Sequence, residues 1–199
     1  MNTKQVKSDR NDLNTAIIVG GLVIGWLLYD GIRTLVQLFA TAGSVTVTTR
    51  VPAQEFVVGI GAGASATVDT ATLTVEDVNV VSVVCLVLAI VLRTACLVGV
   101  TALGVLLCRR LMRGAVFDRV NSRLTFAMSM GLLAAGLAWA WFENMGLNGV
   151  FAALGGEFDG QWMLLMDGMP LFVAAIALGV LVIVFRRGTS LQRDAEGLV

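Results

Sequence analysis

The sequence has no histidine and only two prolines among its 199 residues. Without histidine, the chain lacks the commonest general base, the commonest metal ligand and the usual haem ligand. Its three cysteines, Cys85, Cys96 and Cys108, fall within one apolar run and have no CxxC spacing. Neither a disulfide framework nor a zinc site is therefore predicted. We expect no cofactor, no metal and no catalytic residues.

Charged residues are also scarce. They make up 14% of the chain, whereas hydrophobic residues make up 57%. A soluble domain is usually about half apolar and about a quarter charged, so this composition predicts a membrane protein. The mean hydropathy of +0.84 points the same way. The formal net charge is zero, which argues against a polyanion as partner, and we expect no direct contact with nucleic acid.

Four apolar runs exceed the length of about 18 residues that identifies a transmembrane helix. They predict spans at 14–40, 79–108, 124–143 and 168–186, and thus an all-α transmembrane fold, a four-helix membrane bundle. The first run is well beyond the ~7–15 apolar residues of a signal peptide. We therefore expect it to be a retained span, despite the small residues of "ATAGS" at 40–44.

Basic residues predict the orientation of these spans, because cytoplasmic connections carry an excess of Lys and Arg. The segments 1–13, 109–123 and 186–199 hold three, five and three basic residues, counting Arg186 at the end of the fourth span, whereas 41–78 and 144–167 together hold only Arg50. We expect both termini and the basic loop 109–123 to be cytoplasmic in a bacterial plasma membrane. Anionic lipid is the expected partner of the loop arginines, at about 1 kcal/mol each.

The first outer segment, 41–78, predicts a small extracytoplasmic β element. "SVTVTTRV" and "ATLTVEDV" are rich in Val and Thr and partly alternate, as strands do. An isolated hairpin is marginal in water, so this one is expected to pack on the helix ends or on a neighbouring subunit. The glycines at 59–63 favour a β-turn over a dinucleotide loop, since no helix pattern follows them.

The second outer segment, 144–167, mixes acids with aromatic residues. This mixture predicts a short amphipathic helix or a lid. Its acids match no known cation-binding loop, so a solvated acidic loop is favoured over a cation site.

Ionisable residues within or beside the spans are hypotheses about function by default. A rise of about 1.5 Å per residue places Asp30 roughly 24 Å, Arg93 roughly 22 Å, and Arg33 and Glu143 roughly 28 Å above the inner boundary. They form one layer in the outer third of a core about 30 Å thick, with Asp167 at the start of the fourth span. In one interpretation this layer is a structural clamp, in which Asp30 pairs with Arg93, and Arg33 meets Glu143 or Asp167. In the other it is a site for an anion, a lipid head group or a proton in an outward-facing cavity.

Small residues recur at helical spacing, which allows helices to approach closely in lipid. Gly21 and Gly25 form a GxxxG motif, and further stripes comprise Ala127, Gly131, Ala135, Ala175 and Gly179. They fit either a compact bundle or a dimer interface. Trp139 and Trp141, near the outer end of the third span, are interpreted as interfacial anchors.

Two stretches resemble the DUF2975 family of uncharacterised bacterial four-span membrane proteins. The first is "RRLMRGAVFDRVNSRLTFAM", and its motif residues are Gly114, Phe117, Asp118 and Asn121. The second is "FRRGTSLQRDAEGLV", and its motif residues are Gly188, Leu191, Gln192, Asp194 and Glu196. The outer β segment has no counterpart in this resemblance. The resemblance implies a four-span topology and, from genes encoded beside a small helix-turn-helix regulator, a cytosolic regulatory partner.

Both motifs also make physical sense. Gly114 permits a turn after the second helix, and Asp118, or Asn121 with Ser122, can cap the third helix. The amphipathic tail either docks against the 109–123 loop or presents itself to a cytosolic partner.

The function predicted from these features is that of a non-enzymatic regulatory or accessory membrane protein that acts through protein contacts, in a homo-oligomer or a membrane-protein complex. The alternative is a small oligomeric transporter or channel subunit that uses the outer-third charged layer.

Overall fold

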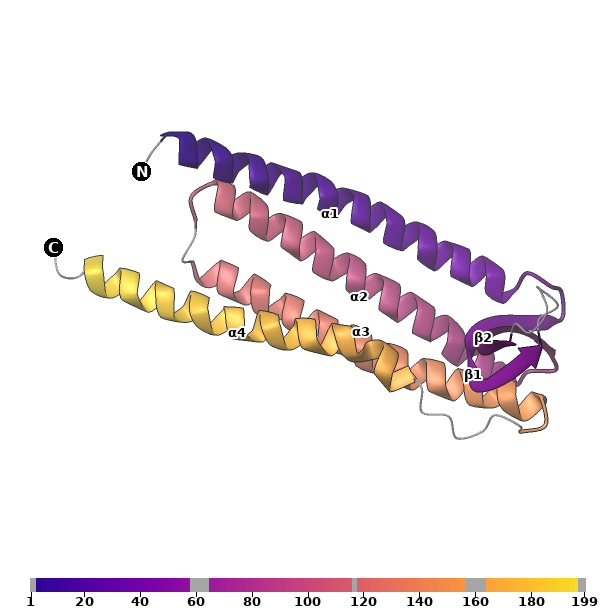
Figure 1. The fold of residues 1–199 in the computed structure, drawn as a ribbon. Helices are drawn as coiled ribbons and strands as arrows, with labels where there is room; N and C mark the ends of the chain where they lie inside the picture. The colour runs from indigo at the N-terminus through magenta and orange to yellow at the C-terminus, as the bar shows by residue number, and fades with distance from the viewer. Residues whose placement is uncertain (1–2, 58–64, 116–117, 157–163, 197–199) are drawn as a thin grey trace.

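Four long helices and one hairpin make up the described part of the chain, in the order α1–β1–β2–α2–α3–α4 (Figure 1). The computed structural model describes residues 3–57, 65–115, 118–156 and 164–196, and among these the side chains of 10–50, 70–115, 118–156 and 168–191. The helices are α1 (Thr3–Leu38), α2 (Val80–Met112), α3 (Arg119–Ala153) and α4 (Leu164–Glu196). The strands are β1 (Ser44–Val57) and β2 (Ser65–Glu76). The predicted four-helix membrane bundle with a small β element is confirmed.

Each helix contains a segment long and apolar enough to cross a membrane. These segments are Arg10–Leu38, Val80–Met112, Arg119–Ala153 and Gly168–Leu191. The chain is thus a multi-pass membrane protein in contact with the lipid bilayer. Both termini lie at the end of the bundle that also holds the α2–α3 turn, and the hairpin lies at the opposite end (Figure 1). We call these the termini end and the hairpin end.

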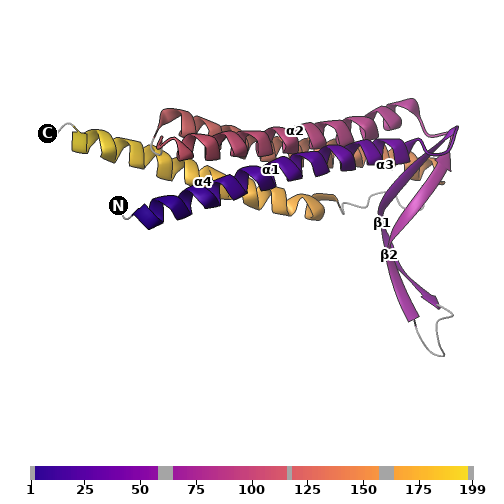
Figure 2. The same cartoon turned by 90° about the horizontal axis from the view of Figure 1, so that it is seen from above.

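The helices pack in chain order and do not close into a ring. α1 packs on α2, α2 on α3, and α3 on α4, whereas the described residues of α1 and α4 form no such packed pair. α1 and α4 both lie on the same side of the α2–α3 pair (Figure 2). One side of the bundle therefore remains open between them.

Small residues bring the neighbouring helices together, though not all of those predicted. A Cβ on Gly31 would lie 2.6 Å from the Thr94 hydroxyl, and one on Gly131 would lie 2.7 Å from Val100. Ala135 and Ala175 are buried between helices. Gly21 and Gly25 have nothing within 4 Å, so this GxxxG motif faces away from the described parts of the chain. Its use as a dimer interface stays a prediction.

α3 extends to Ala153, ten residues past the predicted end of the span at 143. This extension is amphipathic, and Leu147, Val150 and Phe151 are buried in a core formed with Leu38 and Leu86. Two glycines allow the close approach to α2, since a Cβ on Gly149 would lie 1.8 Å from the Ser82 hydroxyl. Burial of this face explains why the helix does not stop at the membrane boundary. The lid and the solvated acidic loop, the other predictions for 144–167, stay predictions, because Glu157 and Asp159 fall within 157–163, outside the described residues.

The hairpin is antiparallel, with Ser44 opposite Glu76 and Val57 opposite Ser65. The register shifts between Arg50 and Gln54, on either side of Pro52, which has no N–H to donate to the ladder. Val45, Val47 and Val75 at the base of the hairpin join the core at the ends of the helices. The predicted packing on the helix ends is thus confirmed for the base. The glycine-rich turn at 59–63 lies outside the described residues.

Candidate functional site

A cavity of about 490 Å³ lies at the hairpin end of the bundle. Its walls come from α1, α2, α3 and the base of the hairpin, and none of the described residues of α4 lines it. The cavity is therefore on the open side of the bundle, where α1 and α4 do not pack on each other. Its volume falls within the range of about 300–1,000 Å³ typical of ligand pockets.

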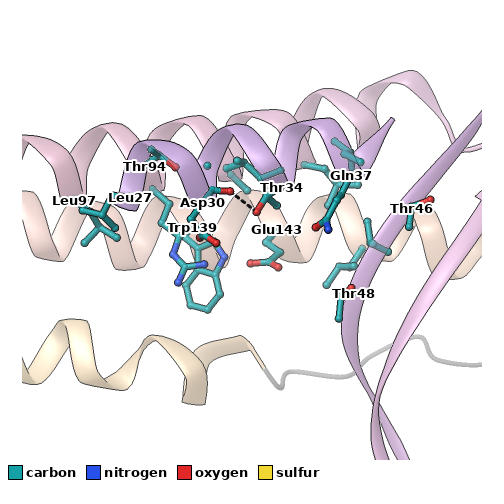
Figure 3. Close-up of a pocket in the computed structure, with 18 of the residues that line it drawn as sticks. Leu27, Asp30, Thr34, Gln37, Thr46, Thr48, Thr94, Leu97, Trp139 and Glu143 are labelled. Carbon is teal, nitrogen blue, oxygen red and sulfur yellow. Dashed lines mark hydrogen bonds between the residues drawn. The ribbon is translucent and has the colours of Figure 1, made fainter. Parts of the chain in front are cut away.

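The lining of the cavity gains polar side chains toward the hairpin. Leu27 and Leu97 lie at one end, Asp30, Trp139 and Glu143 at the middle, and Thr46 and Thr48 at the other end (Figure 3). Gln37, Thr34 and Thr72 add further polar groups on the hairpin side. Leu38, Val47 and Leu147 also line this side, so polar groups are added there to an apolar lining.

Arg93 lies over the ring of Trp139, with its guanidinium carbon 4.7 Å from the ring centroid. Such a cation–π contact is worth about 0.5–1 kcal/mol at an exposed site and about 2 kcal/mol when desolvated. Trp139 is only 8% exposed, whereas Trp141 is 70% exposed. The interpretation of Trp139 as an interfacial anchor was therefore wrong, because it packs inside the bundle and supports Arg93. The sequence could have indicated this burial, because Trp139 lies roughly 22 Å above the inner boundary, at the same depth as Arg93.

Asp30 also lines the cavity, from α1. Its backbone carbonyl accepts a hydrogen bond from the Thr34 hydroxyl at 2.8 Å. Among the described residues, the carboxylate of Asp30 makes no hydrogen bond or ion pair, and the predicted pairing with Arg93 is not formed within 4.0 Å. The two side chains share one cavity without closing a clamp.

The remaining members of the predicted charged layer are Glu143, Arg33 and Asp167. Glu143 lines the cavity, and its Oε2 atom is buried. Arg33 is exposed and is not among the lining residues. The side chain of Asp167 lies outside the described residues. The structure thus brings together Asp30, Arg93 and Glu143.

At the termini end, the α2–α3 connection forms a closed polar network. Arg110 donates to Asn121 Oδ1 at 2.9 Å and forms an ion pair with Asp118. Asn121 is fully buried and donates in turn to the carbonyl of Ala115. The sequence marked Arg110 only as a topology signal. In the sequence, this network could have been recognised from Arg110 and Asp118, which lie on either side of the turn at Gly114.

The predicted turn and cap are confirmed. Gly114 has a φ of 82°, a conformation that residues with a Cβ rarely adopt. Asp118 is the N-cap of α3 and accepts a hydrogen bond from the backbone N–H of Val120. Phe117, between them, lies outside the described residues.

The C-terminal motif continues α4 as a helix to Glu196, past the α2–α3 turn (Figure 1). Within it, Leu191 is 70% exposed, and Gly188 belongs to the same helix. The side chains of Gln192, Asp194 and Glu196 lie outside the described residues. Whether they contact the basic loop stays a prediction.

No family model, no curated protein and no solved structure matches this chain. The resemblance to DUF2975 therefore stays a prediction. Among the described residues, no group of three or more Cys, Asp or Glu could hold a metal ion. The cavity at the hairpin end is the candidate site that the geometry supports best.

Proposed function

We propose that this chain is a non-enzymatic accessory or regulatory protein that acts through contacts with another membrane protein. The observation that carries the proposal is the hairpin, which is longer than its own packing requires. Only its base, around Val45, Val47 and Val75, is buried against the helices. Beyond the register shift at Arg50 and Gln54, the ribbon extends away from the bundle (Figure 2).

A two-stranded ribbon is a suitable contact element. The described sheet has only two strands, so each strand leaves one edge unpaired. Such edges are templates for pairing with another chain, and a hairpin of this kind has little stability alone in water. A partner that covers the distal ribbon would stabilise it and recognise it at the same time.

The termini end supports a second contact, with a cytosolic regulatory partner. Its basic residues favour a cytoplasmic location in a bacterial plasma membrane. α4 runs past the α2–α3 turn, with Leu191 exposed at 70%. This location and this partner agree with what the resemblance to DUF2975 implies.

Site-specific photocrosslinking in native membranes tests the proposal. A photoreactive amino acid is placed at Gln54 or Thr70 on the hairpin, and at Leu22 as a control that is 70% exposed on α1. We expect the hairpin positions to form an adduct with one other protein, identified by mass spectrometry, and Leu22 to form none. Equal protein adducts from all positions, or none from the hairpin, would contradict the proposal. An adduct between two copies of this chain would replace the accessory role with a homo-oligomer.

A variant with a shortened hairpin tests whether the distal ribbon makes the contact. Arg50 lies directly opposite Thr70, so Asn-Gly in place of 51–69 closes a two-residue turn at that pair. The base that packs on the helices is kept. We expect normal membrane insertion and loss of the adduct from Thr70.

The alternative, a small oligomeric transporter or channel subunit, draws on the charges that line the cavity. A transport path needs polar groups through both halves of the membrane. Here the lining becomes apolar at Leu27 and Leu97. Ion or solute flux into proteoliposomes that is abolished by Asp30→Asn would favour this alternative over the accessory role.

A further inference from the structure

We infer that the cavity at the hairpin end binds the head group of a phospholipid that carries a primary amine as well as a phosphate. The acyl chains of this lipid leave the cavity on the open side, between α1 and α4. This inference is independent of the accessory role proposed above, because it uses different residues and a different surface.

The position of the cavity suits a lipid head group. Asp30 and Arg93 lie roughly 24 Å and 22 Å across a core about 30 Å thick, so a head group descends only about 6–8 Å to reach them. The threonines at the hairpin base concentrate polar groups at one end, and Leu27 and Leu97 lie at the other end with Thr94 as its polar member. This order matches a lipid whose polar group points toward the hairpin. Without lining residues from the described part of α4, the side wall is left to the bilayer.

The positive charge in the cavity suits a phosphate. The guanidinium of Arg93 is held over Trp139, and this stacking leaves the N–H groups at its edge available. Arginine binds phosphate through two parallel hydrogen bonds, which gives geometric specificity as well as energy. Asp30 does not take this place, since no ion pair joins the two residues.

The negative charges suit an ammonium group. Asp30 has a carboxylate that makes no hydrogen bond among the described residues, and Glu143 adds a second acid to the lining. An uncompensated charge inside a membrane is costly. A zwitterionic head group supplies both missing partners at once, its phosphate to Arg93 and its ammonium to Asp30.

The balance of charge excludes simpler ligands. Arg93 and Asp30 are the lining charges that form no ion pair among the described residues, so a ligand that carries only a phosphate would leave Asp30 uncompensated. A quaternary ammonium has no N–H to donate to Asp30, and is usually held instead by aromatic faces. Here a face of Trp139 is already taken by Arg93. A primary amine, with three donors, fits best.

Lipid competition on the purified full-length chain tests the inference. The protein is equilibrated with equal amounts of dioleoyl phosphatidylethanolamine, phosphatidylcholine and phosphatidylglycerol, and the retained lipids are counted by native mass spectrometry. We expect phosphatidylethanolamine to be enriched about tenfold, which corresponds to about 1.4 kcal/mol. Glycerophosphoethanolamine, the same head group without acyl chains, serves as the water-soluble competitor. We expect it to displace little lipid.

Single substitutions test which residue binds the amine of the head group and which binds the phosphate. Asp30→Asn should remove the preference for the amine over the choline lipid, whereas Arg93→Gln should reduce retention of all three lipids. Arg33→Gln is the matched control for Arg93→Gln, because Arg33 carries the same charge as Arg93 and lies on the same helix as Asp30, but does not line the cavity. It should change neither measurement. If Arg93→Gln does not fold, Arg93→Lys keeps the charge and should retain phosphatidylethanolamine more weakly than the wild type.

Three results would overturn the inference. One is equal retention of the three lipids by the wild-type chain. Another is an equal loss of lipid in Arg33→Gln and Arg93→Gln, which would indicate a general effect of charge. The third is full displacement of the lipid by glycerophosphoethanolamine, which would indicate a site for a soluble ligand.

Discussion

At the termini end Arg110 lies between Asp118 and Asn121, whereas at the hairpin end Arg93 lies on Trp139 and makes no ion pair with Asp30. Each end thus has an arginine and an aspartate. At the termini end, the partners come from one short connection, eight and eleven residues from Arg110. At the hairpin end, they come from three different helices.

This difference separates a polar network that stabilises the fold from a set of charged side chains that remains available to bind a ligand. A short connection can close its hydrogen bonds around one glycine turn. Charges on separate helices take positions that the packing of those helices sets. At the hairpin end, this packing depends on Gly31, Gly146 and Gly149, and it leaves a cavity between the charges. Arginine and aspartate therefore do not by themselves indicate which of the two roles they have.

The largest expected effect comes from opening the closed network. Asn121→Ala removes a fully buried side chain that bonds Arg110 and the carbonyl of Ala115. Polar groups left without a partner in this way cost about 3 kcal/mol. The midpoint of thermal unfolding in detergent should fall clearly. An unchanged midpoint would show that the network does not stabilise the α2–α3 turn.

The hairpin end should instead be sensitive to packing. Gly149→Ala places a Cβ 1.8 Å from the Ser82 hydroxyl, and overpacking of this kind costs about 2 kcal/mol. Gly25→Ala is the matched control, because Gly25 has open space around it and alanine favours a helix. Unfolding of both variants in the same detergent compares them. Equal stabilities would mean that α2 and α3 separate easily at this end.

Much of the fold follows from periodicity and charge in the sequence. Four spans and a β element were predictable, because apolar length and Val/Thr alternation are local signals. The turn at Gly114 and the cap at Asp118 were predictable for the same reason. The burial of Trp139 and the extension of α3 to Ala153 were not, since both result from contacts with residues far along the chain. The cavity depends on the absence of packing between α1 and α4, for which the sequence carries no local pattern.

Double-mutant cycles compare the two arginines directly. For Arg110→Gln and Asp118→Asn we expect a coupling of about 1 kcal/mol, discounted because the side chains are 30% and 39% exposed. For Arg93→Gln and Asp30→Asn we expect less than about 0.3 kcal/mol, the level at which independent sites add. Both cycles are measured by reversible unfolding in lipid-free detergent. A larger coupling at the hairpin end would restore the clamp interpretation of Asp30 and Arg93.

A small effect is also expected between the two ends, where the described residues of α3 and α4 share one side-chain hydrogen bond. The hydroxyl of Ser129 donates to the carbonyl of Ala175 at 2.7 Å, and both residues are buried. Interhelical hydrogen bonds in membranes average only about 0.6 kcal/mol, because the separated helices find other partners. Ser129→Ala should therefore lower stability by about that amount, measured in the same unfolding assay. A loss as large as that of Asn121→Ala would mean that the bundle depends on polar contacts along its whole length, and the contrast between its ends would then disappear.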